Sequence, residues 1–202
     1  MAGVDFYYAS GSPYAWRVWL AFEHKGAAYN RKTLSFDAGD LKTPEFGKLN
    51  PRRKVPVLVD DDFVLYESAA VVEYIEDRWP QGPALFARDM RKRAIQRRMA
   101  READQYLAGF VQRFATGPDA GEIKDIRQEL ALWDGAAAGD YLTGELSAAD
   151  LTVYPFIALL LRIAGRKADF VKSDIIGPRL AAWNDRMQAL PIVQRTWPPH
   201  WK

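Results

Sequence analysis

The hydrophobic pattern of the chain changes near residue 80, and this change limits the fold more than any other feature. Before it, short apolar runs typical of strands alternate with amphipathic runs typical of helices. After it, only helical spacing is present. The segment Trp79-Pro80-Gln81-Gly82-Pro83 lies at the change, and its two prolines and one glycine favour a boundary. The sequence therefore predicts a small α/β domain followed by an all-helical one.

The first part is predicted to contain four strands and three helices in the order β-α-β-α-β-β-α. Asp60-Asp61-Asp62 separates the last two strands, which are expected to form a tight hairpin. The strands are expected over residues 4–8, 29–36, 56–59 and 63–66, and the helices over 13–25, 41–49 and 68–79.

The second part is predicted to be helical throughout. Its amphipathic runs cover residues 87–115, 121–138, 148–164 and 177–190. We expect a first domain over 1–80, a linker over 81–90 and a helical domain over 91–202.

Composition excludes several classes of chemistry. A chain of 202 residues with 49% hydrophobic and 27% charged residues can bury a sizeable core. The absence of cysteine excludes disulfides, thiolate metal sites and cysteine nucleophiles. With only His24 and His200, a multi-histidine metal site is not expected, and we predict no metal. A net charge of +2 favours neither nucleic acid nor a membrane surface as the partner. The start of the chain does not resemble a signal peptide, so the expected compartment is the cytoplasm.

Ser10-Gly11-Ser12-Pro13 follows the first predicted strand and opens the first helix. Serine before a helix and proline at its first position are common helix-start residues, which is the structural interpretation. A helix N-terminus also stabilises an anion, and a serine hydroxyl beside it supplies a further donor. Both interpretations remain open from the residues alone.

Two further segments carry similar alternatives. Pro56 after Val55 is tolerated at a strand start, but a cis bond there would let Val55 present its backbone to a ligand. Ser68 is a plausible helix cap, and Glu67-Ser68 could also hold the ammonium and carboxylate of an amino acid.

Two other patterns are interpreted as structural. Ser147-Ala148-Ala149-Asp150 is a capping-box variant before a long apolar run. The crowded basic residues between Arg88 and Arg101 are interpreted as a solvated helix face that could secondarily steer an anionic ligand.

Five motifs, taken in order and spacing, resemble the cytosolic glutathione transferase family over nearly the whole chain. The sequence departs from beta- and omega-like members, which use cysteine, and from the Ser-x-Cys of zeta-like isomerases. The motifs are SPYAWRV at residues 12–18, TPEF with LNP at 43–51, KVPVL at 54–58, LYESAAVVEYI at 65–75 and LSAADLTVYP at 146–155.

The resemblance implies a thioredoxin-like N-terminal domain that binds glutathione and a helical C-terminal domain that contributes the pocket for the electrophile. By position, Ser12 matches the serine that stabilises the glutathione thiolate. Val55, before an expected cis Pro56, matches the residue that pairs with the cysteinyl backbone. Glu67 and Ser68 match the residues that hold the γ-glutamyl end.

Further residues are carried over by position. Lys42 and Lys54 fall where the family places polar side chains near the glycyl carboxylate. Asp104 matches an acidic residue that in many members reaches the γ-glutamyl group bound by the other subunit of the dimer. Tyr7 and Tyr8 lie near the catalytic tyrosine of other members, but the helix-start context favours Ser12.

The resemblance implies a homodimeric transferase of detoxification type, with glutathione as co-substrate and no permanently bound cofactor. Arg53 stands where members commonly have glycine, so the loop before the cis bond is expected to bend differently. The alternatives are a non-catalytic ligand- or protein-binding module and a glutathione-dependent isomerase or dehalogenase. Candidate residues of the apolar electrophile pocket, for which ordinary packing is an equal alternative, are Tyr14, Phe110, Phe114, Trp197 and Trp201.

Overall fold

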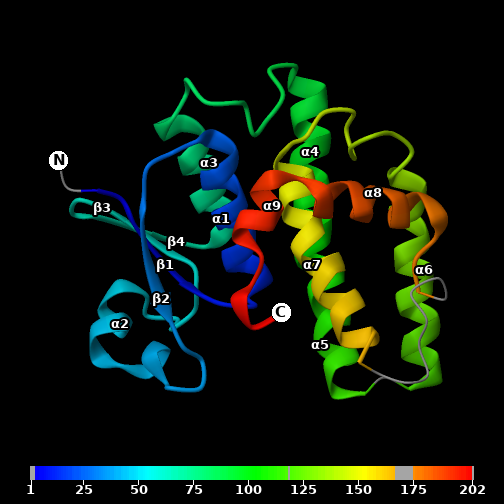
Figure 1. The fold of residues 1–202 in the computed structure, drawn as a ribbon, viewed down its shortest axis with the longest axis horizontal. Helices are drawn as coiled ribbons and strands as arrows, with labels where there is room; N and C mark the ends of the chain where they lie inside the picture. The colour runs from blue at the N-terminus through cyan, green and yellow to red at the C-terminus, as the bar shows by residue number, and fades with distance from the viewer. Residues whose placement is uncertain (1–2, 118, 167–174, 202) are drawn as a thin grey trace. The chain divides into compact units, whose positions relative to one another are not determined.

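The computed structural model describes residues 3–117, 119–166 and 175–201. It divides into two compact units. The first ends at Leu85 and includes the last residues from Arg195, and the second spans Phe86–Gln194. Figure 1 shows a sheet with helices in the first unit and helices alone in the second. The predicted order of an α/β part followed by a helical part is confirmed.

The boundaries of the units differ from the predicted 1–80, 81–90 and 91–202 in two places. The residues after Pro80 pack on the first unit, where Leu85 is fully buried and its N–H donates to Glu76 Oε2 at 3.0 Å. The last residues, expected in the helical domain, also belong to the first unit, because Trp16 Nε1 donates to Thr196 Oγ1 at 2.8 Å. Contacts with the helices of the first unit therefore set both limits.

The first unit contains a four-stranded sheet in the order β2-β1-β3-β4. β2 is parallel to β1, whereas β3 is antiparallel to β1 and β4 is antiparallel to β3. The predicted β-α-β-α-β-β-α order is found. The elements are β1 Asp5–Ala9, α1 Pro13–Lys25, β2 Asn30–Leu34, the 3₁₀ turn η1 Asp40–Lys42, α2 Pro44–Leu49, β3 Val57–Asp60, β4 Phe63–Tyr66 and α3 Ser68–Arg78.

Local signals at both ends of α1 explain its limits. Ser12 precedes the helix and Pro13 is its first residue. Gly26 ends it in the left-handed conformation, with φ 62°, and its N–H donates to Glu23 O at 3.3 Å. The buried face of α1 includes Phe22, whose ring lies 5.5 Å from that of Phe6 on β1. Helix α1 is thus fixed against the sheet by aromatic packing.

The second unit is helical, as predicted. The run over 87–115 is divided by η2, a short π-helical turn, between α4 and α5. The central helix α7 packs against α4, α5 and α8. The elements of this unit are α4 Met90–Glu102, η2 Ala103–Leu107, α5 Ala108–Thr116, α6 Ala120–Ala136, α7 Ala148–Ala164, α8 Pro178–Ala189 and most of α9 Pro191–Thr196. The end of α9 and the 3₁₀ turn η4 Pro199–Trp201 belong to the first unit.

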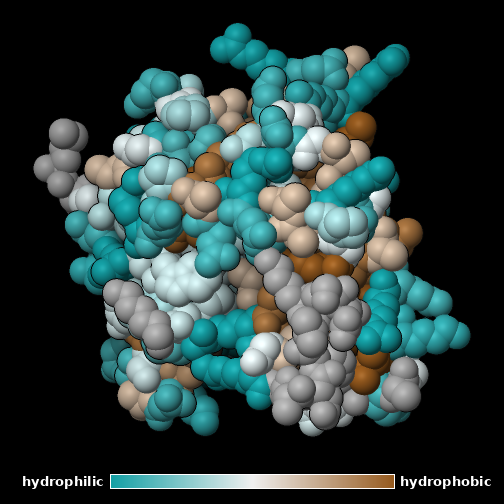
Figure 2. Space-filling model, turned by 45° about the vertical axis from the view of Figure 1, so that its right-hand side comes forward, coloured by the Kyte–Doolittle hydropathy of each residue, from teal (hydrophilic) through white to brown (hydrophobic). Residues whose placement is uncertain are grey.

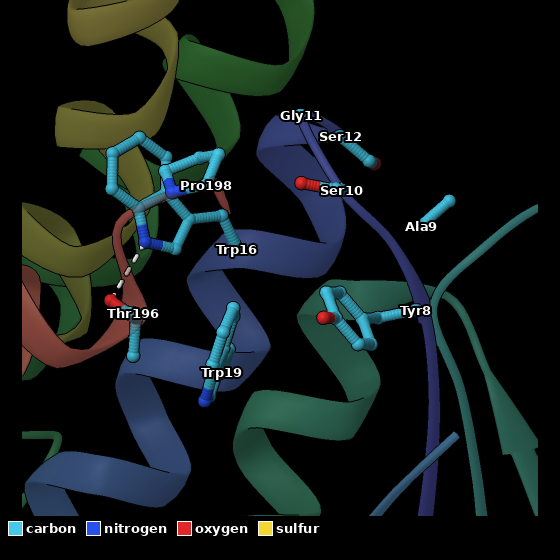
Figure 3. Close-up of a pocket in the computed structure, with 9 residues that line it drawn as sticks. All are labelled: Tyr8, Ala9, Ser10, Gly11, Ser12, Trp16, Trp19, Thr196 and Pro198. Atoms are coloured by element: carbon cyan, nitrogen blue, oxygen red, sulfur yellow. Dashed lines mark hydrogen bonds between the residues drawn. The ribbon is translucent and has the colours of Figure 1, made fainter. Parts of the chain in front are cut away.

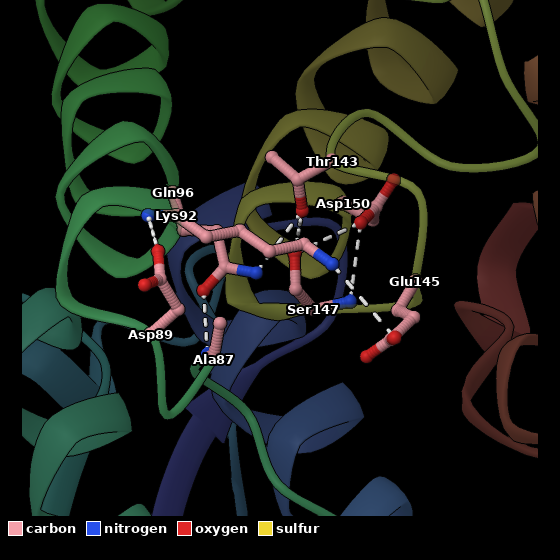
Figure 4. Close-up of polar contacts among 8 residues, drawn as sticks. All are labelled: Ala87, Asp89, Lys92, Gln96, Thr143, Glu145, Ser147 and Asp150. Carbon is pink, nitrogen blue, oxygen red and sulfur yellow. Dashed lines mark hydrogen bonds and ion pairs between the residues drawn. The ribbon is translucent and has the colours of Figure 1, made fainter.

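A closed polar network fixes the start of α7 (Figure 4). Asp150 is fully buried and accepts hydrogen bonds from Ser147 N at 3.1 Å and from Ser147 Oγ at 3.0 Å. It also accepts from Leu142 N at 2.8 Å and from Trp183 Nε1 at 3.0 Å. This network supports the structural interpretation of Ser147-Ala148-Ala149-Asp150.

The face of the molecule drawn in Figure 2 is mainly polar. In Figure 2 hydrophilic residues cover most of the visible face, and hydrophobic residues gather in smaller patches. Among the described residues, every helix is too short or too polar to cross a membrane.

Candidate functional site

The strand register brings several predicted site segments to one edge of the sheet. Tyr7 of β1 pairs with Val57 of β3, so the antiparallel strand β3 begins where β1 ends. Val57 also pairs with Tyr66, so β4 ends at the same edge. The parallel strand β2 ends there too, because Ala9 pairs with Leu34. The segments that follow β1, β2 and β4 therefore leave the sheet at this edge, where the segment before β3 enters it.

The turn between β1 and α1 presents Ser12 at this edge. Ser12 N–H donates to Ala9 O at 3.3 Å, and Gly11 has φ 86°, as the third residue of a type II turn requires. Ser12 Oγ accepts from Ala15 N at 3.3 Å and so caps the helix. In the part of the chain that the structure describes, the hydroxyl donates no hydrogen bond. Its proton is therefore available to an acceptor on a ligand.

The segment before β3 contains the cis peptide bond that the sequence left open, between Val55 and Pro56. Asn50, which is buried, holds the preceding loop. Its Nδ2 donates to Lys54 O at 2.7 Å, and its Oδ1 accepts from Arg52 N at 2.9 Å. Asn50 stood out in the sequence only as part of the LNP motif, so its role in shaping this loop was not predicted.

Arg53 adopts φ 53°, the left-handed region that glycine favours. Arg53 thus takes the backbone conformation that a glycine at this position would adopt readily. Its Nη1 donates to Thr43 O at 3.0 Å and to Leu41 O at 3.5 Å. Arg53 thus links the loop that carries Lys54 to the segment that carries Lys42, and both lysines are exposed.

The start of α3 follows the end of β4 at the same edge. Glu67 has φ 71° and its side chain is 70% exposed, whereas Ser68 is buried. Within the described chain, Glu67 makes no capping hydrogen bond to the helix, and its carboxylate lies 4.0 Å from Arg52 Nε. The N-termini of α1 and α3 therefore both lie at this edge, and their dipoles favour anionic groups.

The two tyrosines on β1 have other partners. Tyr8 is buried, and its hydroxyl accepts from Thr33 Oγ1 at 3.3 Å. The ring of Tyr7 lies 6.5 Å from that of Phe46 on α2. Of these three residues, Ser12 is the one that caps the start of α1.

The candidate electrophile-pocket residues are divided between the two units. In the first unit, the rings of Trp197 and Trp201 lie 5.6 and 5.3 Å from that of Trp16, and the Arg17 guanidinium lies 5.2 Å from the Tyr14 ring. In the second unit, Phe110 on α5 is half-buried under the guanidinium of Arg113, at 4.5 Å, and Phe114 is fully buried. Asp104 lies half-buried in η2. The packing alternative thus fits Phe114 best.

A small pocket lies beside the turn in the first unit (Figure 3). Its volume of about 10 Å³ is enough for one water molecule. It is lined by Tyr8, Ala9, Ser10, Gly11, Ser12, Trp16, Trp19, Thr196 and Pro198.

A contact next to this pocket was not predicted from the sequence. Ser10 Oγ and His200 Nδ1 are 2.7 Å apart, although 190 positions separate them. The only available signal was that His200 is one of two histidines in the chain. The described residues contain no group of three or more acidic or histidine side chains placed to hold a metal.

Known proteins match the chain in both units. The family model described as "Glutathione S-transferase, N-terminal domain" matches residues 11–78. "Glutathione S-transferase A" of Pleuronectes platessa is 29% identical over 96% of this chain and 91% of its own length. The chain belongs to the glutathione S-transferase family.

Two further matches agree with this membership. "Glutathione S-transferase 1" of Dianthus caryophyllus is 41% identical over 92 residues, which are 46% of this chain and 41% of that protein. The crystal structure of a glutathione S-transferase from the Antarctic clam Laternula elliptica has a TM-score of 0.87 and 27% identity, covering 99% of this chain and 94% of that one. The predicted family and its thioredoxin-like N-terminal fold are confirmed.

Proposed function

We propose that this glutathione S-transferase family member activates the thiol of glutathione for attack on small, largely apolar electrophiles. The observation that carries the proposal is the strand register, because it brings Ser12, the cis Val55–Pro56 bond and Glu67–Ser68 to one edge of the sheet. These segments supply a hydroxyl donor, the backbone N–H and C=O groups of Val55, and a site for an amino-acid head group. Glutathione carries a chemical group that matches each of the three.

Each proposed binding role follows from the charge or the hydrogen-bonding groups of the residue. The exposed Glu67 carboxylate pairs with the γ-glutamyl ammonium, while Ser68 at the start of α3 binds the adjoining carboxylate. Val55 pairs through its backbone with the cysteinyl residue. Lys42 and Lys54 attract the glycyl carboxylate.

The chemical step begins with loss of the thiol proton. A free thiol has a pKa near 8.5 and is only a few per cent ionised at neutral pH. The Ser12 hydroxyl and the α1 N-terminus together stabilise the anion by about one to two pKa units, each worth about 1.4 kcal/mol. The proton passes to solvent. The sulfur then forms a bond to the electrophilic carbon while the leaving group departs with its electron pair.

The remaining roles rest on the family pattern. We propose that Tyr14, Phe110, Trp197 and Trp201 supply apolar contacts to the electrophile, and that Asp104 reaches the glutathione bound by the other protomer. The cytoplasm is the proposed compartment, because glutathione is kept reduced there. Detoxification is the proposed role.

We also propose a two-fold symmetric homodimer, a common arrangement for soluble proteins. The proposed contact surfaces are α3 and α4. Met90 and Ile95 on α4 are 71% and 47% exposed, and burial in an interface would remove this apolar surface from water. Light scattering at micromolar concentration should give the mass of a dimer, and the mass of a monomer would contradict the proposal.

Glu67→Ala tests the binding site most directly. A bound γ-glutamyl ammonium would bury the Glu67 carboxylate, and loss of one partner of a buried charge pair costs on the order of 2–5 kcal/mol, so calorimetry should detect no glutathione binding by this variant. Asp77→Ala, an exposed acidic residue elsewhere on α3, is the matched control and should bind glutathione like the unmodified protein. Equal binding by Glu67→Ala would show that the site assignment is wrong.

A turnover screen separates the enzyme from its alternatives. The purified protein is assayed with glutathione and aromatic halides, epoxides, isothiocyanates or peroxides. Conjugation supports the transferase. Glutathione binding with no turnover of any compound would support a non-catalytic module, and product formed by isomerisation or halide removal would support the third possibility.

A further inference from the structure

The last residues of the chain form a strap over α1. This C-terminal strap, Arg195–Trp201, belongs to the same compact unit as the sheet. Arg195 Nε lies 2.8 Å from Glu23 Oε2, and Trp16 Nε1 donates to Thr196 Oγ1 at 2.8 Å. The ring of Trp201 also packs edge-on against Trp16 at 5.3 Å. These three contacts involve residues of the strap other than His200.

His200 extends from the strap to the turn that presents Ser12. Its Nδ1 lies 2.7 Å from Ser10 Oγ. Its ring also covers Gly11, because a Cβ atom on Gly11 would lie 2.8 Å from His200 Cε1 and 3.0 Å from Nε2. Ser10 and Gly11 are the two central residues of the turn between Ala9 and Ser12. The imidazole therefore contacts both residues that determine the path of this turn.

The side chains of the two serines lie on opposite sides of the turn's backbone. In Figure 3 the side chains of Ser10 and Ser12 point in opposite directions from the backbone. Ser10 is thus occupied by the strap, while Ser12 is directed elsewhere. Any effect of His200 on Ser12 must pass through the backbone of the turn.

We propose that His200 is a positioning residue for Ser12, a role that rests on the proposed transferase function. By bonding Ser10 and covering Gly11, the imidazole fixes the turn and so fixes the direction of the Ser12 hydroxyl. A donor aimed at a thiolate works only within a narrow geometry, and a displacement of about 1 Å can reduce a rate by about 10²-fold. Loss of one hydrogen bond that restrains the turn should reduce turnover by about 10-fold.

Three variants separate the hydrogen bond from the ring. His200→Phe keeps a ring over Gly11 but cannot bond Ser10. His200→Asn keeps an amide near the place of Nδ1 and can bond Ser10 again. Ser10→Ala removes the same hydrogen bond from the other partner, and it covers the case in which His200→Phe fails to fold.

The readouts are kcat, KM for glutathione and the thiolate absorbance of the glutathione complex as a function of pH. His200→Phe and Ser10→Ala should each lower kcat by about 10-fold and move the thiolate titration to higher pH, with KM within about 2-fold. The double variant that combines His200→Phe with Ser10→Ala should lose no more of kcat than either single variant, because both changes remove the same hydrogen bond. His200→Asn should restore most of kcat.

The outcomes are distinguishable. Unchanged kcat and thiolate titration in His200→Phe, with only a lower melting temperature, would show that His200 merely stabilises the fold. Equal losses in His200→Phe and His200→Asn would also overturn the role of the hydrogen bond. If the unmodified protein neither binds glutathione nor turns over any electrophile, the proposed function fails as well. If it does both while His200→Phe matches it, only the inference about His200 fails.

Discussion

Helix α1 begins after Ser12 and helix α7 begins after Ser147. The two helix starts differ in whether the serine hydroxyl already donates a hydrogen bond among the described residues. Ser147 is buried, and its hydroxyl donates to Asp150 Oδ2 at 3.0 Å (Figure 4). Ser12 is half-buried, and its hydroxyl accepts only the 3.3 Å bond from Ala15 N among the described residues. The first turn of α7 contains Asp150, whereas that of α1 contains no acidic residue.

This difference separates a structural helix start from a binding one. At α7 the positive end of the helix dipole and the nearby donors are already matched by a carboxylate of the chain. At α1 no carboxylate of the first turn does so, and an anion from a ligand can take that place. A serine before a helix is therefore informative about function only when its partners are known.

The largest effect is expected at Asp150, which completes the start of α7. Asp150→Ala removes the acceptor of four hydrogen bonds from buried residues, so we expect a loss of about 4 kcal/mol in the free energy of unfolding. Denaturant unfolding measures this loss. Asp150→Asn, which keeps one carbonyl oxygen, should lose less. A loss below about 1 kcal/mol in Asp150→Ala would show that the network does not stabilise the second unit.

The same carboxyl predicts a pH dependence. Burial raises the pKa of Asp150 above that of the unfolded chain, so the folded state holds the proton more tightly. The stability that this group contributes is therefore full below the unfolded pKa of about 3.9 and declines as pH rises through the raised pKa. The free energy of unfolding of the unmodified protein, measured against that of Asp150→Asn, should show this decline. A difference that instead increases with pH would contradict it.

A smaller effect is expected for Ser147→Ala. This change removes one of the hydrogen bonds of Asp150 and a helix-start hydroxyl, so we expect a loss of about 1.5 kcal/mol on unfolding. Glutathione binding and turnover should remain unchanged. Reduced turnover with intact stability would remove the distinction between the two helix starts.

Much of the fold could be predicted because its signals are local. Apolar spacing located the strands and helices of both parts, and Gly26 and Pro13 marked the limits of α1. The domain limits were less predictable. Pro80–Pro83 resembles a linker in sequence, but Leu85 beyond it is buried in the first unit by contacts with residues earlier in the chain.

The site was predictable only where a family motif records it. Ser12, Val55, Glu67 and Ser68 come from motifs, and their shared edge follows from strand register, which no local pattern fixes. The contact of His200 with Ser10 joins opposite ends of the chain. Residue spacing carries no signal for such a pair.

The most direct test of the account is the pH titration of the thiolate absorbance of the glutathione complex, compared between the unmodified protein and Ser12→Ala. Ser12→Ala should bind glutathione nearly as well but titrate about one pKa unit higher, which is about 1.4 kcal/mol, with turnover reduced on the order of 10- to 100-fold. Ser147→Ala, the matched serine of the second unit, should titrate like the unmodified protein. An unchanged titration and turnover in Ser12→Ala would contradict the account, and a loss confined to Tyr7→Phe or Tyr8→Phe would assign the thiolate donor to a tyrosine.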